Sequence, residues 1–229
     1  MKNKLMYLVA VLFAAFVCFS CSDDDKNDGD EELTGVWNYG SKGDVYLELE
    51  YAENKIDISD FLSILPAEIK AAIAVLYPDG KIPVADVKKL LAPYAKQQMQ
   101  EYFRGINFLS DSELEILITK DKKDQKIKTT YEIQGTVLKI STQSEDFKTI
   151  TNNMIPEAVA SIDLNYFFKD GKLTLYVNTT YAKTIISMIP RILVAAEVIP
   201  EEVLPGVTTA VQNISNKITK LEFGPVLVR

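Results

Sequence analysis

The sequence predicts an α+β fold in which an antiparallel β-barrel of about eight strands carries helical insertions. Several short segments alternate polar and apolar residues, a pattern typical of antiparallel strands with one face in water. Two of these segments flank Asp170 and Gly171, and Asp-Gly is a strong hairpin signal because both turn positions need a positive φ. Amphipathic helical segments separate the strands into blocks. Strands joined by such short turns close most simply into a barrel, which leaves no sheet edge exposed.

Residues 1–20 have the layout of a secretory signal, with a positively charged start and a fifteen-residue apolar run that ends at Phe19. This run is too short for a membrane-spanning helix, which needs about 20 residues. Residues 18–21 read Cys-Phe-Ser-Cys and resemble a lipobox, the site at which lipoproteins are cleaved and acylated. We therefore expect Cys21 to be the site of lipid attachment.

Residues 21–33 are expected to form an acidic, disordered tether. Positions 23–32 hold seven acidic residues and one lysine, and high charge with few apolar residues disfavours folding. The run 22–26 resembles the acidic export signal of surface lipoproteins in the Bacteroidota. This resemblance implies a lipid-anchored protein of the outer membrane, at the cell surface or alternatively on the periplasmic face. The body that follows, 34–229, is close to neutral, which argues against nucleic-acid binding.

The predicted strands follow in order along the body. The first covers 35–39, and the second covers 44–51, where Val45, Leu47 and Leu49 alternate with Glu48 and Glu50. Further strands are predicted at 114–119, 127–133, 137–141, 162–168, 173–177 and 218–223.

Helical insertions are predicted at about 60–104 and 182–215. The late insertion contains the segment 183–199, in which only Lys183, Arg191 and Glu197 are charged and apolar residues cover most of the helix circumference. Three interpretations follow: a helix buried between the barrel and another helix, a cap over the barrel mouth, or a surface that faces a partner. A membrane span is disfavoured by the charges and by Pro190.

The segment Gly35-Val-Trp37, at the start of the first strand, resembles the Gly-x-Trp signature of lipocalins. The body as a whole is similar to lipocalin-like surface lipoprotein families of unknown function in the Bacteroidota. The resemblance implies that Trp37 lies at the barrel floor beneath a basic residue of the final strand, for which Lys217 and Lys220 are the candidates. It also implies a small hydrophobic or amphiphilic ligand inside the barrel.

Residues on the apolar strand faces and on the late helix form the candidate ligand pocket. Tyr131 and Tyr166 are expected to point into the barrel, where their hydroxyls would serve as polar groups for a ligand or bond to the backbone of a packed interior. The expected pocket residues are Trp37, Tyr131, Tyr166, Phe168, Ile189 and Leu193.

Composition excludes much catalytic chemistry. The chain has no histidine, and both cysteines, Cys18 and Cys21, lie before the body, so imidazole-based triads and thiolate sites are excluded there. Glu48 and Glu50 share the polar face of a strand, where a general acid would lack the burial that raises its pKa. We expect no enzyme, no metal and no cofactor. The expected function is ligand binding at the membrane, and the alternative is an accessory module that docks onto an outer-membrane protein partner.

Overall fold

A computed structural model describes residues 32–64, 71, 74–120, 122–150, 159–195 and 199–229. It contains a nine-stranded antiparallel sheet, of which eight strands close into a barrel. Around the barrel these strands follow the order β1 (Gly35–Asn38), β5 (Phe103–Phe108), β6 (Glu113–Lys120), β7 (Lys123–Gln134), β8 (Val137–Ser141), β9 (Ser161–Lys169), β10 (Lys172–Tyr176) and β11 (Ile218–Val228). The predicted α+β barrel with helical insertions is therefore confirmed.

The barrel is closed by the pairing of β1 with β11, where Asn38 lies opposite Val228. On its other edge β1 pairs with β5 from Gly35 opposite Phe108 to Asn38 opposite Gly105. The four residues of β1 thus join the two ends of the sheet.

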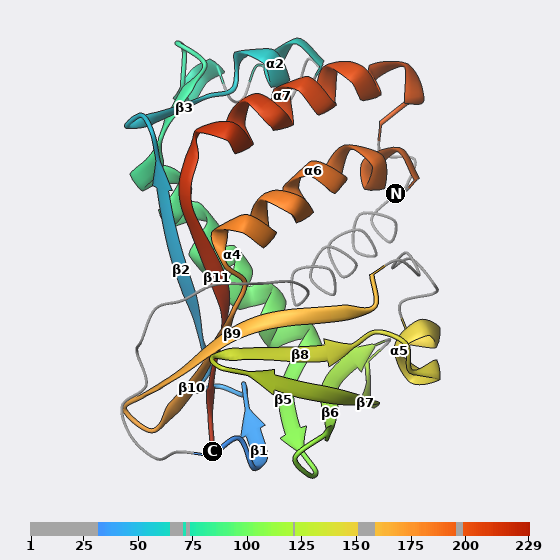
Figure 1. The fold of residues 1–229 in the computed structure, drawn as a ribbon. Coiled ribbons are helices and arrows are strands. Elements are labelled where there is room, and N and C mark those ends of the chain that lie inside the picture. The colour runs from blue at the N-terminus through green and yellow to red at the C-terminus, as the bar shows by residue number, and fades with distance from the viewer. Residues whose placement is uncertain (1–31, 65–70, 72–73, 121, 151–158, 196–198) are drawn as a thin grey trace.

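One strand of the barrel was not predicted. Phe103 and Arg104 were expected at the end of the helical insertion 60–104, and no element was predicted for 105–108, but the segment Phe103–Phe108 forms β5. The ninth strand, β2 (Asp44–Tyr51), pairs with β11 from Tyr51 opposite Ile218 to Asp44 opposite Val226. It lies on the same edge of β11 as β1, and together β2 and β11 extend beyond the barrel as a long two-stranded ribbon (Figure 1).

The first helical insertion also contains a small second sheet. Its strands, β3 (Lys55–Asp57) and β4 (Lys81–Pro83), flank α2 (Ser59–Ile64), and α4 (Val84–Tyr102) follows. Helix α4 packs against β2 and the start of β5. Helices α2 and α4 lie largely within 60–104, the range in which a helical insertion was expected. The two strands were not predicted, since they are three residues each and too short to display a period.

The second insertion contains α6 (Thr179–Ala195), the short helix η1 (Glu201–Val203) and α7 (Leu204–Lys217). Helices α6 and α7 pack against each other and against β11, and Figure 1 shows them alongside the extended ribbon rather than inside the barrel. A further short helix, α5 (Glu145–Ile150), packs on β7.

Local hydrogen bonds fix where α6 begins. The Asn178 side chain accepts a hydrogen bond from the backbone N–H of Tyr181 at 3.2 Å, as expected of an N-cap residue. The Thr179 hydroxyl accepts one from the backbone N–H of Leu221 at 2.9 Å, beside the irregular register of β11 between Ile218 and Lys220. The helix is thereby attached to the strand at its first turn.

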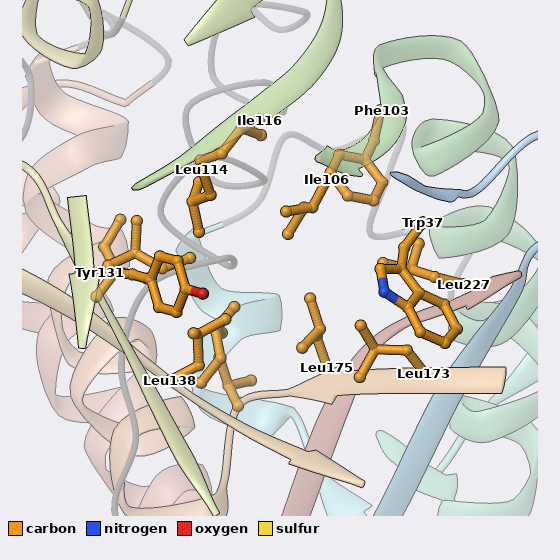
Figure 2. Packing of buried hydrophobic residues seen from close by; sticks show 14 of the residues in the cluster. Trp37, Phe103, Ile106, Leu114, Ile116, Tyr131, Leu138, Leu173, Leu175 and Leu227 are labelled. Carbon is orange, nitrogen blue, oxygen red and sulfur yellow. The ribbon is translucent and has the colours of Figure 1, made fainter. Parts of the chain in front are cut away.

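The hydrophobic core lies inside the barrel and contains side chains from every strand of the closed sheet, several of which Figure 2 shows. Fully buried members include Trp37, Ile106, Leu138, Leu173 and Leu175. Leu33 also joins this core, so the folded body begins one residue before the expected boundary at 34.

The predicted signal at 1–20, Cys21 and the tether up to residue 31 lie outside the described residues. Within the described residues, none of the helices combines the length and the apolar character needed to span a bilayer.

Candidate functional site in the barrel

Trp37 lies inside the barrel, where it is completely shielded from solvent. Its indole ring contacts the Phe168 ring, with 5.6 Å between the ring centres. Figure 2 shows the indole nitrogen directed toward the aliphatic side chains of Ile106 and Leu175. The sequence-based placement of Trp37 in the barrel interior therefore agrees with the structure.

Two polar atoms in this part of the core have no hydrogen-bond partner among the described residues: the indole Nε1 of Trp37 and the hydroxyl of Tyr39. Tyr39 follows β1 and packs on Phe103, with 6.0 Å between the ring centres. Burial, and then the nearby charge of Asp44, raise the pKa of Tyr39 well above its usual range, so the hydroxyl stays protonated. Each of these groups is a donor that an apolar lining leaves unsatisfied.

A cation lies directly over Trp37. The Arg229 guanidinium carbon is 4.6 Å from the centre of the indole ring, and its Nη2 donates a hydrogen bond to the Glu32 carbonyl oxygen at 3.0 Å. Arg229 follows β11 directly. The basic residue over the indole ring is therefore Arg229, at the C-terminal end of the final strand.

The two lysines expected in this role are engaged elsewhere, so that prediction was wrong. Lys217 forms an ion pair with Glu53 at 2.7 Å, and Lys220 forms one with Glu222 at 3.5 Å. Lys217 ends α7 and Lys220 lies in the part of β11 that pairs with β2, whereas Trp37 lies opposite Ile106 in β5. The pairing of the first and last strands decides which residue reaches the indole, and that pairing has no local sequence signal.

Replacement of Arg229 by alanine is expected to lower the free energy of unfolding by about 0.5–1 kcal/mol, the usual size of an exposed cation–π contact. It should also shift the emission of Trp37, the single tryptophan of the chain. Urea unfolding followed by fluorescence and by circular dichroism measures both effects. Arg229→Lys, which keeps the charge, is expected to retain part of the stability, and an Arg229→Ala protein with unchanged stability and emission would contradict the contact.

Tyr131 and Tyr166 both lie in the barrel wall with hydroxyls bonded to the backbone. Tyr131 donates to the Ser110 carbonyl oxygen at 2.8 Å, and Tyr166 donates to the Gly135 carbonyl oxygen at 3.4 Å. Of the two alternatives that the sequence left open, this geometry matches the packed one. Phe168 is buried between Trp37 and Tyr166, with 6.0 Å between its ring centre and that of Tyr166.

Ile189 and Leu193 are partly buried on the second half of α6. That half lies away from β1 and from the end of the barrel that holds Trp37 (Figure 1). The structure therefore brings Trp37, Phe168 and Tyr166 together in one chain of ring contacts, and it places the α6 residues apart from them.

The outward face of α6 is polar. Its exposed positions are Thr180, Thr184, Ser187 and Arg191, which recur at helical spacing. The buried positions include Ala182, Ile185 and Pro190. Since α6 packs on α7 and β11, this arrangement favours the buried helix among the three interpretations of the segment 183–199.

An aromatic cluster on the outer side of the sheet was not foreseen. Tyr46 packs edge-on against Phe167 and Tyr176, with 5.7 Å and 5.2 Å between ring centres, and its hydroxyl donates to Glu222 Oε2 at 2.8 Å. Burial and the Glu222 carboxylate raise the pKa of Tyr46 well above its usual range. Phe167 and Tyr176 occupy positions that alternation assigns to the solvent side, so a residue pattern alone gives no signal for their burial.

No group of three or more His, Cys, Asp or Glu side chains suited to a metal ion occurs within the described ranges. Comparisons with models of known protein families, with curated proteins and with solved structures gave no match to this chain.

Proposed function

We propose that this chain is a lipid-anchored, lipocalin-like binding protein that holds a small hydrophobic or amphiphilic molecule in its barrel. In this proposal Cys21 carries the lipid and the body acts at the outer-membrane surface. The observation that supports binding is the unsatisfied Nε1–H donor of Trp37 within an aliphatic and aromatic lining. A buried donor without an acceptor costs about 1–3 kcal/mol, and an oxygen atom on a bound molecule would recover that cost.

The geometry defines the kind of molecule. Its apolar part would contact aliphatic side chains such as Ile106 and Leu175, which lie on the side toward which the indole nitrogen is directed (Figure 2). Its acceptor, a carbonyl, carboxylate or ether oxygen, would lie at Trp37. Such a division between one polar contact and a larger apolar lining is typical of small-molecule sites.

Trp37 provides the test because it is the single tryptophan of the chain. Titration with long-chain fatty acids and with lysophospholipids is expected to change its fluorescence in a saturable way. Native mass spectrometry of gently purified protein is expected to show a molecule bound at one per chain. Trp37→Phe, which keeps a ring but removes the donor, should weaken binding about 3–10-fold by mass spectrometry, the equivalent of one hydrogen bond.

The matched control is Ile133→Ala, a change at a side chain that is 43% exposed on β7, which should leave binding unchanged. Absence of a saturable response to every probe, together with no bound molecule in the native spectrum, would refute the binding proposal. Mass spectrometry of membrane-extracted protein tests the anchor, and it is expected to show the added mass of acyl chains on Cys21.

A further inference from the structure

Helix α4 presents large apolar side chains to solvent. Leu90 is 64% exposed, Leu91 is 42% exposed and Tyr94 is 47% exposed, and their spacing places them on one face of the helix. The opposite side packs on β2 and β5 and buries Met99. We call Leu90, Leu91 and Tyr94 the α4 face.

Basic residues border the α4 face. Lys88 lies three residues before Leu91 and is therefore its neighbour on the helix surface. Lys89 lies on the flank of the helix, where its side chain is 77% exposed, with Asp86 as a weak surface partner at 3.7 Å. Leucines with a tyrosine and lysines on long apolar stems are the composition that settles at a bilayer interface, where the stems lie among lipid chains and the charges reach the headgroups.

We propose that the α4 face rests on the lipid bilayer to which the chain is anchored. This inference depends on the proposed lipid at Cys21. Ten residues separate Cys21 from Glu32, where the described body begins, and fully extended they reach about 36 Å. Helix α4 runs directly into β5, which pairs with β1 a few residues after Glu32. Tyr94 lies eight residues before the end of α4 at Tyr102, about 12 Å along the helix axis, so a tether of this reach lets the anchor and the α4 face enter the same bilayer.

The size of the α4 face favours lipid over a protein partner. A stable protein interface takes roughly 20–30 residues from each side, far more than three side chains provide. Contact with a bilayer to which the chain is already tethered is effectively intramolecular, so a few inserted side chains suffice. The contact would fix the orientation of the barrel relative to the membrane.

A single labelled cysteine tests this contact. The body after Cys21 contains no cysteine, and acylation consumes the Cys21 thiol, so Leu91→Cys gives a unique labelling site in the anchored chain. The labelled protein is reconstituted in vesicles of phosphatidylethanolamine and phosphatidylglycerol that carry a doxyl-labelled lipid. Ile133→Cys on β7 is the matched control because Ile133 is 43% exposed, close to the 42% of Leu91.

A bimane probe at position 91 is expected to shift to the blue and to be quenched at least about twofold more than the probe at position 133, because it would lie among lipid chains. Adding Leu90→Glu to the Leu91→Cys chain should abolish the difference while the circular dichroism spectrum stays the same. Equal quenching at both positions would overturn the inference. So would a blue shift at position 91 that depends on protein concentration in detergent without vesicles, or one accompanied by a crosslinked partner protein and no lipid quenching.

Thiol titration separates failure of the anchor from failure of the contact. A denatured Leu91→Cys chain has one free thiol when Cys21 is acylated. A second free thiol on a chain cleaved before Cys21 would show that the anchor is absent, and it would overturn the inference through the tether on which it depends. One free thiol together with equal quenching at positions 91 and 133 would show that the anchor is present. That result would reject only the contact between the α4 face and the bilayer.

Discussion

Gly105→Ala is expected to lower the free energy of unfolding by about 3–5 kcal/mol, a large fraction of the roughly 5–15 kcal/mol that is typical of a folded domain. A Cβ atom on Gly105 would lie 2.1 Å from the carbonyl oxygen of Trp37 and 3.0 Å from the Cα of Asn38, both backbone atoms of β1. Gly105 also has a φ of +145°, which L side chains rarely adopt. Strand β1 cannot retreat from the added atom, because it is held between β5 and β11 at the closure of the barrel.

Gly135→Ala is the matched control for this prediction. Gly135 also has a positive φ, of +61°, but a Cβ there would meet nothing within 4 Å. Its replacement should therefore lower the free energy of unfolding by only about 1–2 kcal/mol, the cost of holding an L residue in the left-handed backbone conformation. Urea unfolding followed by far-ultraviolet circular dichroism measures both variants, and equal losses would show that the close approach of β1 and β5 does not matter for stability.

Trp37→Ala is expected to lower the free energy of unfolding by about 3–5 kcal/mol, the usual range when a large aromatic side chain is removed from a core. Trp37 is completely buried, and its ring contacts both Phe168 and the Arg229 guanidinium. All of these contacts would be lost, and the cavity would lie beside the residues that close the barrel.

Circular dichroism during urea unfolding is the suitable measurement for this series, since the Trp37 variants lack the single tryptophan of the chain. Trp37→Phe should lower the free energy of unfolding by less, about 1–2 kcal/mol, because the smaller phenyl ring still fills part of the volume that the indole occupies. Ile133→Ala, at a side chain that is 43% exposed near the end of β7, should stay within about 0.5 kcal/mol of the parent. A Trp37→Ala protein as stable as the Ile133→Ala protein would mean that the barrel core relaxes around the loss.

Most strands could be predicted because their pattern is local. The Asp170 hairpin is the clearest case: Asp170 and Gly171 have φ values of 53° and 68°, and Lys169 pairs with Lys172 across the turn. The alternation along β7 places Ile127, Thr129 and Tyr131 inside the barrel, where all three are buried.

The strand that was missed lacks such a pattern. Phe103 follows α4 without an intervening turn residue, and the register of β5 shifts between Phe103 and Gly105, which breaks the alternation. Gly105 reads as a strand breaker in the sequence, yet the structure needs it because the backbone of β1 approaches so closely. A tertiary contact therefore overrides the local signal.

Some residues of the candidate site could also be predicted from the sequence, and others could not. Trp37 could be placed in the barrel interior because Gly35 and Trp37 resemble the Gly-x-Trp signature and because aromatic side chains mostly pack in the core. Arg229 could not, because its place over the indole depends on the pairing of two strands at opposite ends of the body. Ile189 and Leu193 were assigned to the pocket from an apolar composition that is equally typical of a helix packed between α7 and β11.

The pairing of Asn38 with Val228 also has a consequence for how the chain folds. The two residues are 190 positions apart, and contacts of such long range make folding slow, because the entropy of closing a long loop is lost before the contacts form. A chain made from its N-terminus cannot complete the barrel until Val228 is free to pair. During that interval β1 can already pair with β5, but the outer edge of β1 and the edge of β10 have no partner in β11, so they are exposed to aggregation.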